Sequence, residues 1–558
     1  MRKTKGITLI ALVITIIILL ILSGISISAL TNQGLFKNAK LAKEKAEKEQ
    51  KKETSLLDQY ESELNKYIEN GRWDGKVNKP ELMTGMSAIK FTEPTDSAEG
   101  TTVDTSSSDK EWYNYENKKW ANAKTEDGSM WVWIPRYAYR IHKENGVETQ
   151  KFDIVFLVGL TDNYYDENGK LQTAQRQTSE DQTIVTNGDT YTVHPAFTNE
   201  SSINYTNGGW NEELAGIWVA KFEAGYASGN NSATVKASSV NYSQDTAYVP
   251  AVETGTTTTT TTARNWLDGE YGTTTAIKYP TFQGLTYSMN YINHNDAYRI
   301  SKVLTESGNI YGLSSNSTDS HLMKNSEWGA VSYLSQSKYG LNGSDIILNN
   351  VTLSNSTKSI YAVTGCASST ADASAVSTTI GALNNRTQSG VYVWTQKNGT
   401  AASSTGTIYG IYDMSGGTWE RTAGLVNNEN RNLTTYGSQV IPDLNNGKST
   451  RYITVYPHDS IKDSTSITNT DANLNTASQA NYVKNTKIYG DGIRETSTAG
   501  TGKSSWYSDY SYFAGLAYPF FFRGGYYGHT SGAGLFYFYR ASGNSDYGGG
   551  FRTVLVSL

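Results

Sequence analysis

Apolar and polar residues alternate with a period of two in two segments, and this pattern predicts the clearest strands of the chain. These segments are GSMWVWIPRYAYRI at 128–141 and GIWVAKFEAGY at 216–226. Two further segments repeat apolar residues at helical spacing, which predicts amphipathic helices over 288–304 and 321–340. Runs rich in Ser, Thr and Asn at 227–276, 342–408 and 427–485 separate these elements and predict surface loops.

The first 70 residues follow a different pattern. Three basic residues within the first five precede an uncharged apolar run that ends at Leu30, long enough to cross a bilayer as a helix. The basic start is expected to stay cytoplasmic, which places the rest of the chain outside the cell. Residues 31–70 are rich in Ala, Lys, Glu and Leu and carry one apolar stripe. We therefore expect a basic leader at 1–6, a transmembrane helix at 7–30 and an amphipathic helical stalk at 31–70.

The sequence KGITLI at 5–10 resembles the processing site of type IV prepilins, which are cut after a glycine that precedes the apolar helix. The resemblance implies cleavage between Gly6 and Ile7 and a pilin-like anchor that contacts the membrane and other pilin subunits. The family usually has Glu at the fifth mature position, where this chain has Ala11. A plain membrane anchor is the alternative interpretation.

The composition of the whole chain indicates what kind of protein it is. Charged residues make up 18% of its 558 residues and the net charge is -5, so no nucleic-acid partner is expected. The abundance of Tyr, Gly, Ser, Thr and Asn is typical of a β-rich extracellular protein. Cys366 is the single cysteine, which rules out a disulfide within the chain and a cysteine-based metal cluster. Residues 71–119 are expected to form a linker with short strands.

Five segments beyond residue 120 resemble, in this order, the formylglycine-generating-enzyme (sulfatase-modifying factor) family. They are GSMWVWIPRYAY, GIWVAKFEAGY, LMKNSEWGAVSYL, YGIYDMSGGTWERT and the terminal pair RGGYY and GGFRTVL. The resemblance implies a C-type-lectin-like domain over 120–558. The expected fold class is therefore α+β, with a long N-terminal pilin-like helix followed by a large C-type-lectin-like domain with long loops.

Several residues of these motifs are expected to build the scaffold. Gly416 and Gly417 permit a tight backbone path, and Trp419 and Trp328 each bury a large apolar surface. Asp413 and the Asn-rich loops offer oxygen ligands that could hold a structural Ca²⁺. Four charged residues are candidates for paired internal charges, the alternative being exposure to solvent: Glu327, Glu420, Arg523 and Arg552.

The chain lacks the chemistry of the catalytic members of that family. Members that oxidise a substrate cysteine use a pair of cysteines near the terminal motif, whereas Cys366 lies far from it. The six histidines are scattered singly, without the spacing of a metal site. We therefore predict a protein that is not an enzyme, with no catalytic or metal-binding residues. An extracellular oxidoreductase of this family is the less favoured alternative.

A candidate ligand face lies between the two terminal signatures, at 523–552. Tyr with small polar residues is the composition of adaptable binding surfaces. Alternation along LFYFYR places Tyr537 and Tyr539 on one face and Phe536 and Phe538 on the other. The predicted ligand-binding residues are Tyr526, Tyr527, His529, Tyr537, Tyr539, Asn544, Asp546 and Tyr547.

This arrangement resembles the variable ends of C-type-lectin-fold proteins that are diversified by retroelements. It implies a cell-surface adhesin or receptor, anchored in the bacterial membrane or a pilus filament, that binds an extracellular protein, a glycan or a phage component. Two alternatives stay open. The chain could be a structural minor pilin without a specific ligand, or the tyrosines could only cover the core of the domain or a subunit contact.

Overall fold

The structure, a computed structural model, divides the chain into two units, Met1–Asn70 and Gly71–Leu558. In the first unit it describes Lys43 and Lys45, and both are helical. The elements below all belong to the second unit. The described residues are Lys43, Lys45, 77–92, 100–103, 112–177, 182–199, 209–225, 227–228, 233–234, 279–290, 292–354, 360–368, 376–378, 391–444, 447–459, 478–485, 488–546 and 548–558.

The first large sheet has seven antiparallel strands in the order β14-β27-β11-β4-β3-β1-β2. Its centre confirms the two predicted strands, since β4 (Met130–Pro135) pairs with β11 (Gly216–Ala220) and both are buried along their whole length. Trp133 and Trp218 lie opposite each other in this pair. The other strands are β1 (Ser87–Lys90), β2 (Thr101–Thr102), β3 (Asn122–Lys124), β14 (Thr318–Leu322) and β27 (Thr553–Ser557).

A second sheet is built from two antiparallel hairpins in the order β6-β5-β10-β9. The hairpin of β5 (Tyr137–Glu144) and β6 (Val147–Phe156) turns at Asn145-Gly146, where φ is 52° and 80°. The hairpin of β9 (Thr183–Thr186) and β10 (Asp189–Val193) turns at Asn187-Gly188, where φ is 50° and 86°. Both dipeptides accept two consecutive positive φ angles, which is what a two-residue turn between twisted strands requires.

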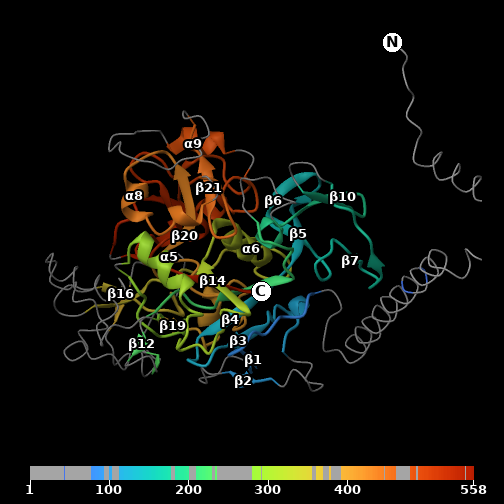
Figure 1. The fold of residues 1–558 in the computed structure, drawn as a ribbon, viewed down its shortest axis with the longest axis horizontal. Coiled ribbons are helices and arrows are strands. Elements are labelled where there is room, and N and C mark those ends of the chain that lie inside the picture. Colours follow the sequence, from blue (N-terminus) through green and yellow to red (C-terminus); the bar gives the residue numbers. More distant parts are fainter. Residues whose placement is uncertain are drawn as a thin grey trace, which may run out of the picture. The chain divides into compact units, whose positions relative to one another are not determined.

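The C-terminal sheet has the order β21-β20-β24-β25-β23-β22, with β26 paired to β20. Figure 1 shows the neighbouring strands β20 and β21 of this sheet. Its longest strands are β20 (Trp419–Asn427), β24 (Phe520–Gly524) and β25 (Gly534–Ala541). The shorter strands are β21 (Thr454–Pro457), β22 (Thr501–Gly502), β23 (Ser511–Tyr512) and β26 (Gly549–Phe551). Strands β24 and β25 pair in antiparallel register, with Phe522 opposite Tyr539.

Smaller pieces complete the described part of the domain. Two-stranded or three-stranded sheets are formed by β7 (Tyr164–Tyr165) with β8 (Leu171–Gln172), β12 (Ala227–Ser228) with β13 (Ala233–Thr234), β17 (Cys366–Ser368) with β19 (Val391–Val393), and β15 (Val351–Ser354) with β16 (Ile360–Ala362) and β18 (Val376–Thr378). The 3-10 helices are Tyr115–Asn117, Pro195–Phe197, Gly399–Ala402, Ile441–Asp443, Trp506–Ser508 and Thr530–Gly532.

The two predicted amphipathic helices are confirmed, although both are shorter than their sequence patterns. They are α5 (His294–Lys302) and α6 (Asn325–Ser335), and two further short helices are α8 (Asn432–Tyr436) and α9 (Ser478–Lys484). Every residue of α6 is buried, because the helix packs against both β6 and β20 (Figure 1). Trp328 on α6 donates a hydrogen bond from Nε1 to the carbonyl oxygen of Leu535, 2.7 Å away.

The expected fold class, α+β with a long N-terminal pilin-like helix, is wrong. In the second unit the regular secondary structure among the described residues is mostly β-strand, and the four α-helices there span 5 to 11 residues. No helix among the described residues has the length and apolar character needed to cross a membrane. Aromatic and β-branched residues at alternating positions fill most of the core, and these residue types favour strands over helices. The segment 7–30 lies outside the described residues, as does 31–70 apart from two lysines.

All four predicted internal charges are buried, and three of them lie in ion pairs. Arg552 and Glu420 are joined by two hydrogen bonds of 2.6 and 2.9 Å. Glu327 accepts a hydrogen bond of 2.9 Å from Nε2 of His321. Arg523 is held instead by carbonyl oxygens, including those of Asp491 and Gly492.

Candidate ligand-binding surface

The two faces of the C-terminal sheet carry different aromatic side chains. One face is buried, where Phe521 of β24 and Phe538 of β25 pack in one apolar cluster with Phe513 and Tyr456. The opposite face carries Trp419, Phe522 and Tyr539 from three neighbouring strands. Alternation along each strand sends successive side chains to opposite faces, so one Phe-rich and Tyr-rich sequence can line both.

The rings on the opposite face form a continuous row across the sheet. The indole of Trp419 stacks on Phe522 at a centroid distance of 5.4 Å and an interplanar angle of 21°. Tyr539 lies beside Phe522 in the strand pairing, and its ring is 5.5 Å from Tyr512 and 6.0 Å from Tyr510. We name the half-buried rings of this row and its flank the aromatic face: Trp419, Tyr510, Tyr512, Tyr526, His529 and Tyr539.

A tight loop after β24 brings Tyr526 and His529 to the same face. Gly524 and Gly525 have φ of 78° and 74°, a conformation that favours glycine. A Cβ on Gly525 would also lie 2.7 Å from the Cβ of Ala533. The loop sets the ring of Tyr526 at 4.3 Å from Trp419 and at 4.5 Å from His529.

Buried tyrosines support these rings from below. Tyr537 is fully buried, and its hydroxyl accepts a hydrogen bond of 3.0 Å from Nε1 of Trp419, which fixes the orientation of the indole. Tyr527 is 5% exposed and packs against Tyr526 at 4.8 Å. Both belong to the predicted ligand-binding set, and the structure brings them together with the aromatic face but as supporting residues with little exposed surface.

Asn544 and Asp546 of the predicted set lie in the loop between β25 and β26. The backbone carbonyl of Asn544 accepts a hydrogen bond from Nη2 of Arg421. The Asp546 carboxylate accepts a hydrogen bond of 2.8 Å from the backbone of Gly548, which closes a turn beside Trp419. Tyr547 lies outside the described residues, as do Gly6 and Ile7 of the predicted processing site.

Sequence reasoning missed three members of the aromatic face. The Gly-Gly-Thr-Trp-Glu motif places Trp419 in the scaffold, yet its indole is half-buried and contacts Phe522, Tyr526 and His529. Tyr510 and Tyr512 lie outside the interval 523–552 and reach the face because β23 pairs in parallel with β25. The alternation DYSY at 509–512 was the available signal.

Burial shifts the pKa values of His529 and of two tyrosines at the aromatic face. Burial lowers the pKa of His529 to about 4, so its imidazole is neutral near pH 7. Burial likewise raises the pKa of Tyr537 and of Tyr539, which keeps both phenols protonated. At neutral pH these side chains therefore offer neutral rings and hydrogen-bonding groups without a charge.

We expect the His529 imidazole to titrate near pH 4 in the folded protein, because its protonated form would lose hydration between the rings of Tyr526 and Tyr537. NMR titration of the histidine ring protons measures this directly, and loss of the signal in His529→Gln assigns it. A midpoint between about 6 and 7, the ordinary range for histidine, would show that the ring is solvated.

Outside the aromatic face, the described residues offer few groups for metal binding or nucleophilic chemistry. No group of three or more His, Cys, Asp or Glu among the described residues could hold a metal ion. Cys366 is buried, and burial raises the pKa of its thiol. Asp413, the candidate calcium ligand, accepts hydrogen bonds from Asn349 Nδ2 at 2.8 Å and from the backbone of Gly365 at 2.9 Å.

The chain was compared with known proteins. No protein-family model matches it, and a search of curated proteins finds no significant match. The resemblance of the terminal motifs to formylglycine-generating enzymes stays a prediction.

Proposed function

We propose that this chain is an extracellular, cell-surface binding protein that is not an enzyme and that holds its ligand on the aromatic face. The observation that carries the proposal is that aromatic side chains line both faces of the C-terminal sheet. The Phe face supplies one packed cluster. On the other face, Trp419 and Tyr539 pack against the main core of the domain, yet their rings stay only half-buried and so keep surface that a ligand can contact. Partly exposed aromatic residues on a fixed backbone are typical of binding hot spots.

The support beneath the rings favours the same function. A ring that is already held in place loses little conformational entropy when a ligand contacts it, so more of the contact energy appears as affinity. Trp419 is oriented by Tyr537 and stacked on Phe522, and Tyr526 is placed by a glycine turn. Of the alternatives, a structural role without a ligand requires no such preorganised solvent-facing row.

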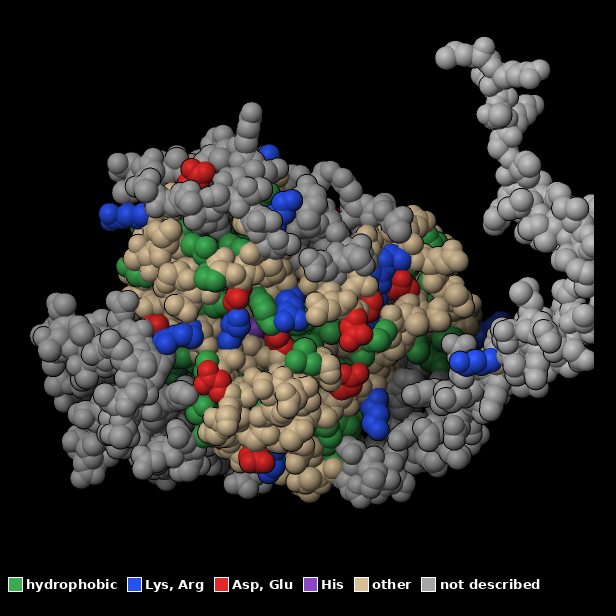
Figure 2. All heavy atoms as spheres, viewed as in Figure 1, with side chains coloured by type: hydrophobic (Ala, Val, Ile, Leu, Met, Phe, Trp, Pro, Cys, Tyr) green, Lys and Arg blue, Asp and Glu red, His purple; other side chains and the backbone are tan. Residues whose placement is uncertain are grey.

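The surface charge is mixed on the face drawn in Figure 2. Acidic and basic side chains are interspersed there, and polar uncharged groups and backbone cover much of the described surface. A surface of this kind recognises a partner by shape, stacking and hydrogen bonds more than by long-range attraction. Because His529 and Tyr539 of the aromatic face are neutral near pH 7, we expect ligand binding there to depend weakly on salt concentration.

Replacing Tyr512, Tyr526 and Tyr539 together with Ser is expected to weaken ligand binding by at least about tenfold, because three partly exposed ring contacts are lost. Binding of the full chain to arrays of glycans and of extracellular proteins identifies the ligand and measures the effect. Tyr392→Ser is the matched control, since Tyr392 is another half-buried tyrosine and lies in β19. Equal binding by the triple variant with an unchanged melting temperature would contradict the proposal.

A further inference from the structure

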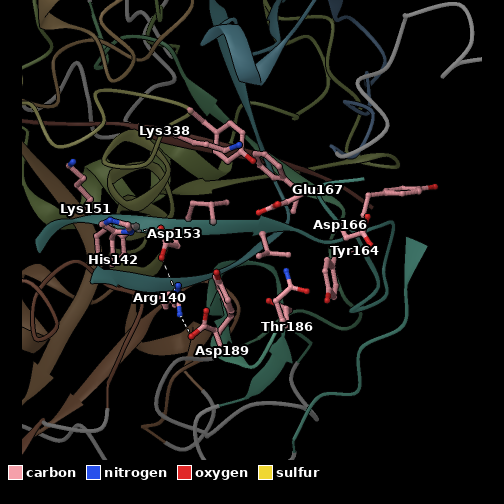
Figure 3. Close-up of a pocket in the computed structure, with 18 of the residues that line it drawn as sticks. Arg140, His142, Lys151, Asp153, Tyr164, Asp166, Glu167, Thr186, Asp189 and Lys338 are labelled. Atoms are coloured by element: carbon pink, nitrogen blue, oxygen red, sulfur yellow. Dashed lines mark hydrogen bonds and ion pairs between the residues drawn. The ribbon is translucent and has the colours of Figure 1, made fainter. Parts of the chain in front are cut away.

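A separate cavity of about 580 Å³ lies over the two-hairpin sheet (Figure 3). We name it the hairpin pocket. Its floor is formed by β5 and β6, and its walls by the β9–β10 turn, the segment 164–167 and residues 338–342 after α6. The volume falls within the range of pockets that hold small molecules. None of its lining residues belongs to the aromatic face.

The charged side chains at the centre of the pocket are already paired with one another. Asp153 accepts a hydrogen bond of 2.9 Å from Nε of Arg140, and its other oxygen lies 2.7 Å from Nδ1 of His142. Arg140 also pairs with Asp189, and its guanidinium lies 5.0 Å from the ring of Tyr191. Figure 3 shows this chain of side chains crossing the strands from Asp153 to Asp189.

The cations at the rim are paired as well. Nζ of Lys151 lies 3.4 Å from Glu144, and Nζ of Lys338 lies 3.1 Å from Glu116. Apart from His142, the lining has three basic groups against four acidic ones, Asp153, Asp166, Glu167 and Asp189, a net of -1. An anionic ligand would have to displace these carboxylates. A cationic ligand would have to compete with Arg140 for Asp153 and Asp189, and with the hydrogen bonds that Asp166 accepts from Gln172 and from its own turn, which leaves only the exposed Glu167. The charge pattern therefore favours an uncharged ligand.

The uncharged groups specify the ligand further. Four tyrosines line the pocket. Tyr165 is half-buried and supplies a flat, partly exposed ring surface, whereas Tyr164, Tyr191 and Tyr339 are at most 9% exposed. Thr186, Asn187 and Asn342 add groups that can donate and accept hydrogen bonds beside the carboxylates. Pyranose sugars match this combination, because they present apolar C–H faces to rings and hydroxyls to carboxylates and amides. From this geometry we infer that the hairpin pocket binds a short neutral saccharide, free or attached to a glycoprotein.

The test is titration of the full chain with neutral trisaccharides (maltotriose, cellotriose, mannotriose and fully N-acetylated chitotriose), followed by calorimetry or saturation-transfer NMR. Sialyllactose and a heparin-derived disaccharide serve as charged comparators. We expect at least one neutral trisaccharide to bind with a micromolar to millimolar Kd, and the charged sugars to bind more weakly. The trisaccharide that binds is then compared with the same trisaccharide coupled to a carrier protein. The tighter binder shows whether a free sugar or a glycoprotein is the preferred ligand. If no neutral sugar binds at millimolar concentration, or only charged sugars bind, the inference is wrong.

Two variants test whether the sugar binds in the hairpin pocket. Tyr165→Ser and Asp189→Ala each change a side chain that is not fully buried, so the fold should be preserved, and each is expected to weaken sugar binding by roughly tenfold. The triple Ser variant of the aromatic face is the control and should bind the sugar as the parent does. Sugar binding that survives both pocket variants, or that is lost in the aromatic-face variant, would overturn the assignment.

Discussion

Arg552→Met is expected to lower the free energy of unfolding by about 3–5 kcal/mol, the cost of removing one partner of a buried ion pair. The Arg552 side chain is fully buried and donates two hydrogen bonds to the Glu420 carboxylate. It also donates to the carbonyl oxygens of Ala220 and Tyr412, 2.6 and 2.8 Å away. The substitution leaves a buried carboxylate and two carbonyl groups without these donors. Urea unfolding at pH 8 measures the loss.

The same variant should recover stability as the pH falls. Burial raises the pKa of Glu420 to about 7 even beside Arg552, and removal of the guanidinium raises it further. Because the folded state then binds a proton that the unfolded state releases above about pH 4.5, lower pH favours folding of the variant. The loss at pH 5 should therefore be smaller than at pH 8.

Two controls separate the buried charge from simple loss of packing. The double variant Glu420→Gln with Arg552→Met removes the charge and should recover much of the lost stability. Lys338→Met breaks an exposed ion pair with Glu116 and should cost at most about 1 kcal/mol. A loss of under about 1 kcal/mol in Arg552→Met would mean that water reaches Glu420 and replaces the guanidinium.

Local patterns in the sequence were enough to predict the central elements of the domain. Strands β4, β5 and β11 and helices α5 and α6 appear where periodicity placed them. The Asn-Gly turns at 145–146 and 187–188 were equally visible signals for hairpins. The order of the strands was not predictable in this way. Gly549–Phe551, for example, pairs in parallel with β20, more than a hundred residues earlier, and such pairing depends on packing across the whole domain.

The candidate binding surface was predicted only in part for a similar reason. The alternation of side chains along the strand correctly predicted that Tyr539 and Phe538 lie on opposite faces of the sheet. This placement depends only on neighbouring residues of one strand. Alternation could not show that Tyr537 is covered, since the covering groups are Trp419 and His529 from elsewhere in the chain. No sequence pattern predicted the hairpin pocket. Arg140, Asp153 and Asp189 are brought together by the pairing of strands, and not by a regular spacing along the sequence.

Gly329→Ala is expected to lower the free energy of unfolding by about 2–4 kcal/mol, although alanine is the better helix former by about 1 kcal/mol. Gly329 lies inside α6, and a Cβ there would be 2.1 Å from the carbonyl oxygen of Gly490. That atom belongs to a loop held by Arg523, which donates hydrogen bonds of 2.7 and 3.0 Å to the carbonyl oxygens of Asp491 and Gly492. The loop can move away only if these hydrogen bonds are strained or broken.

The effect should extend to the aromatic face. Arg523 also donates a hydrogen bond of 2.9 Å to the carbonyl oxygen of Tyr537, whose hydroxyl orients Trp419. Displacement of Arg523 in Gly329→Ala should therefore alter the environment of Trp419 as well as stability, and the ring signals of His529 beside it report the change by NMR. Gly532→Ala is the matched control, because a Cβ there meets no atom closer than 3.8 Å and its stability should change by under about 0.5 kcal/mol. If both variants unfold at the same urea concentration as the parent, the close approach of α6 to the 490–492 loop does not restrict the helix.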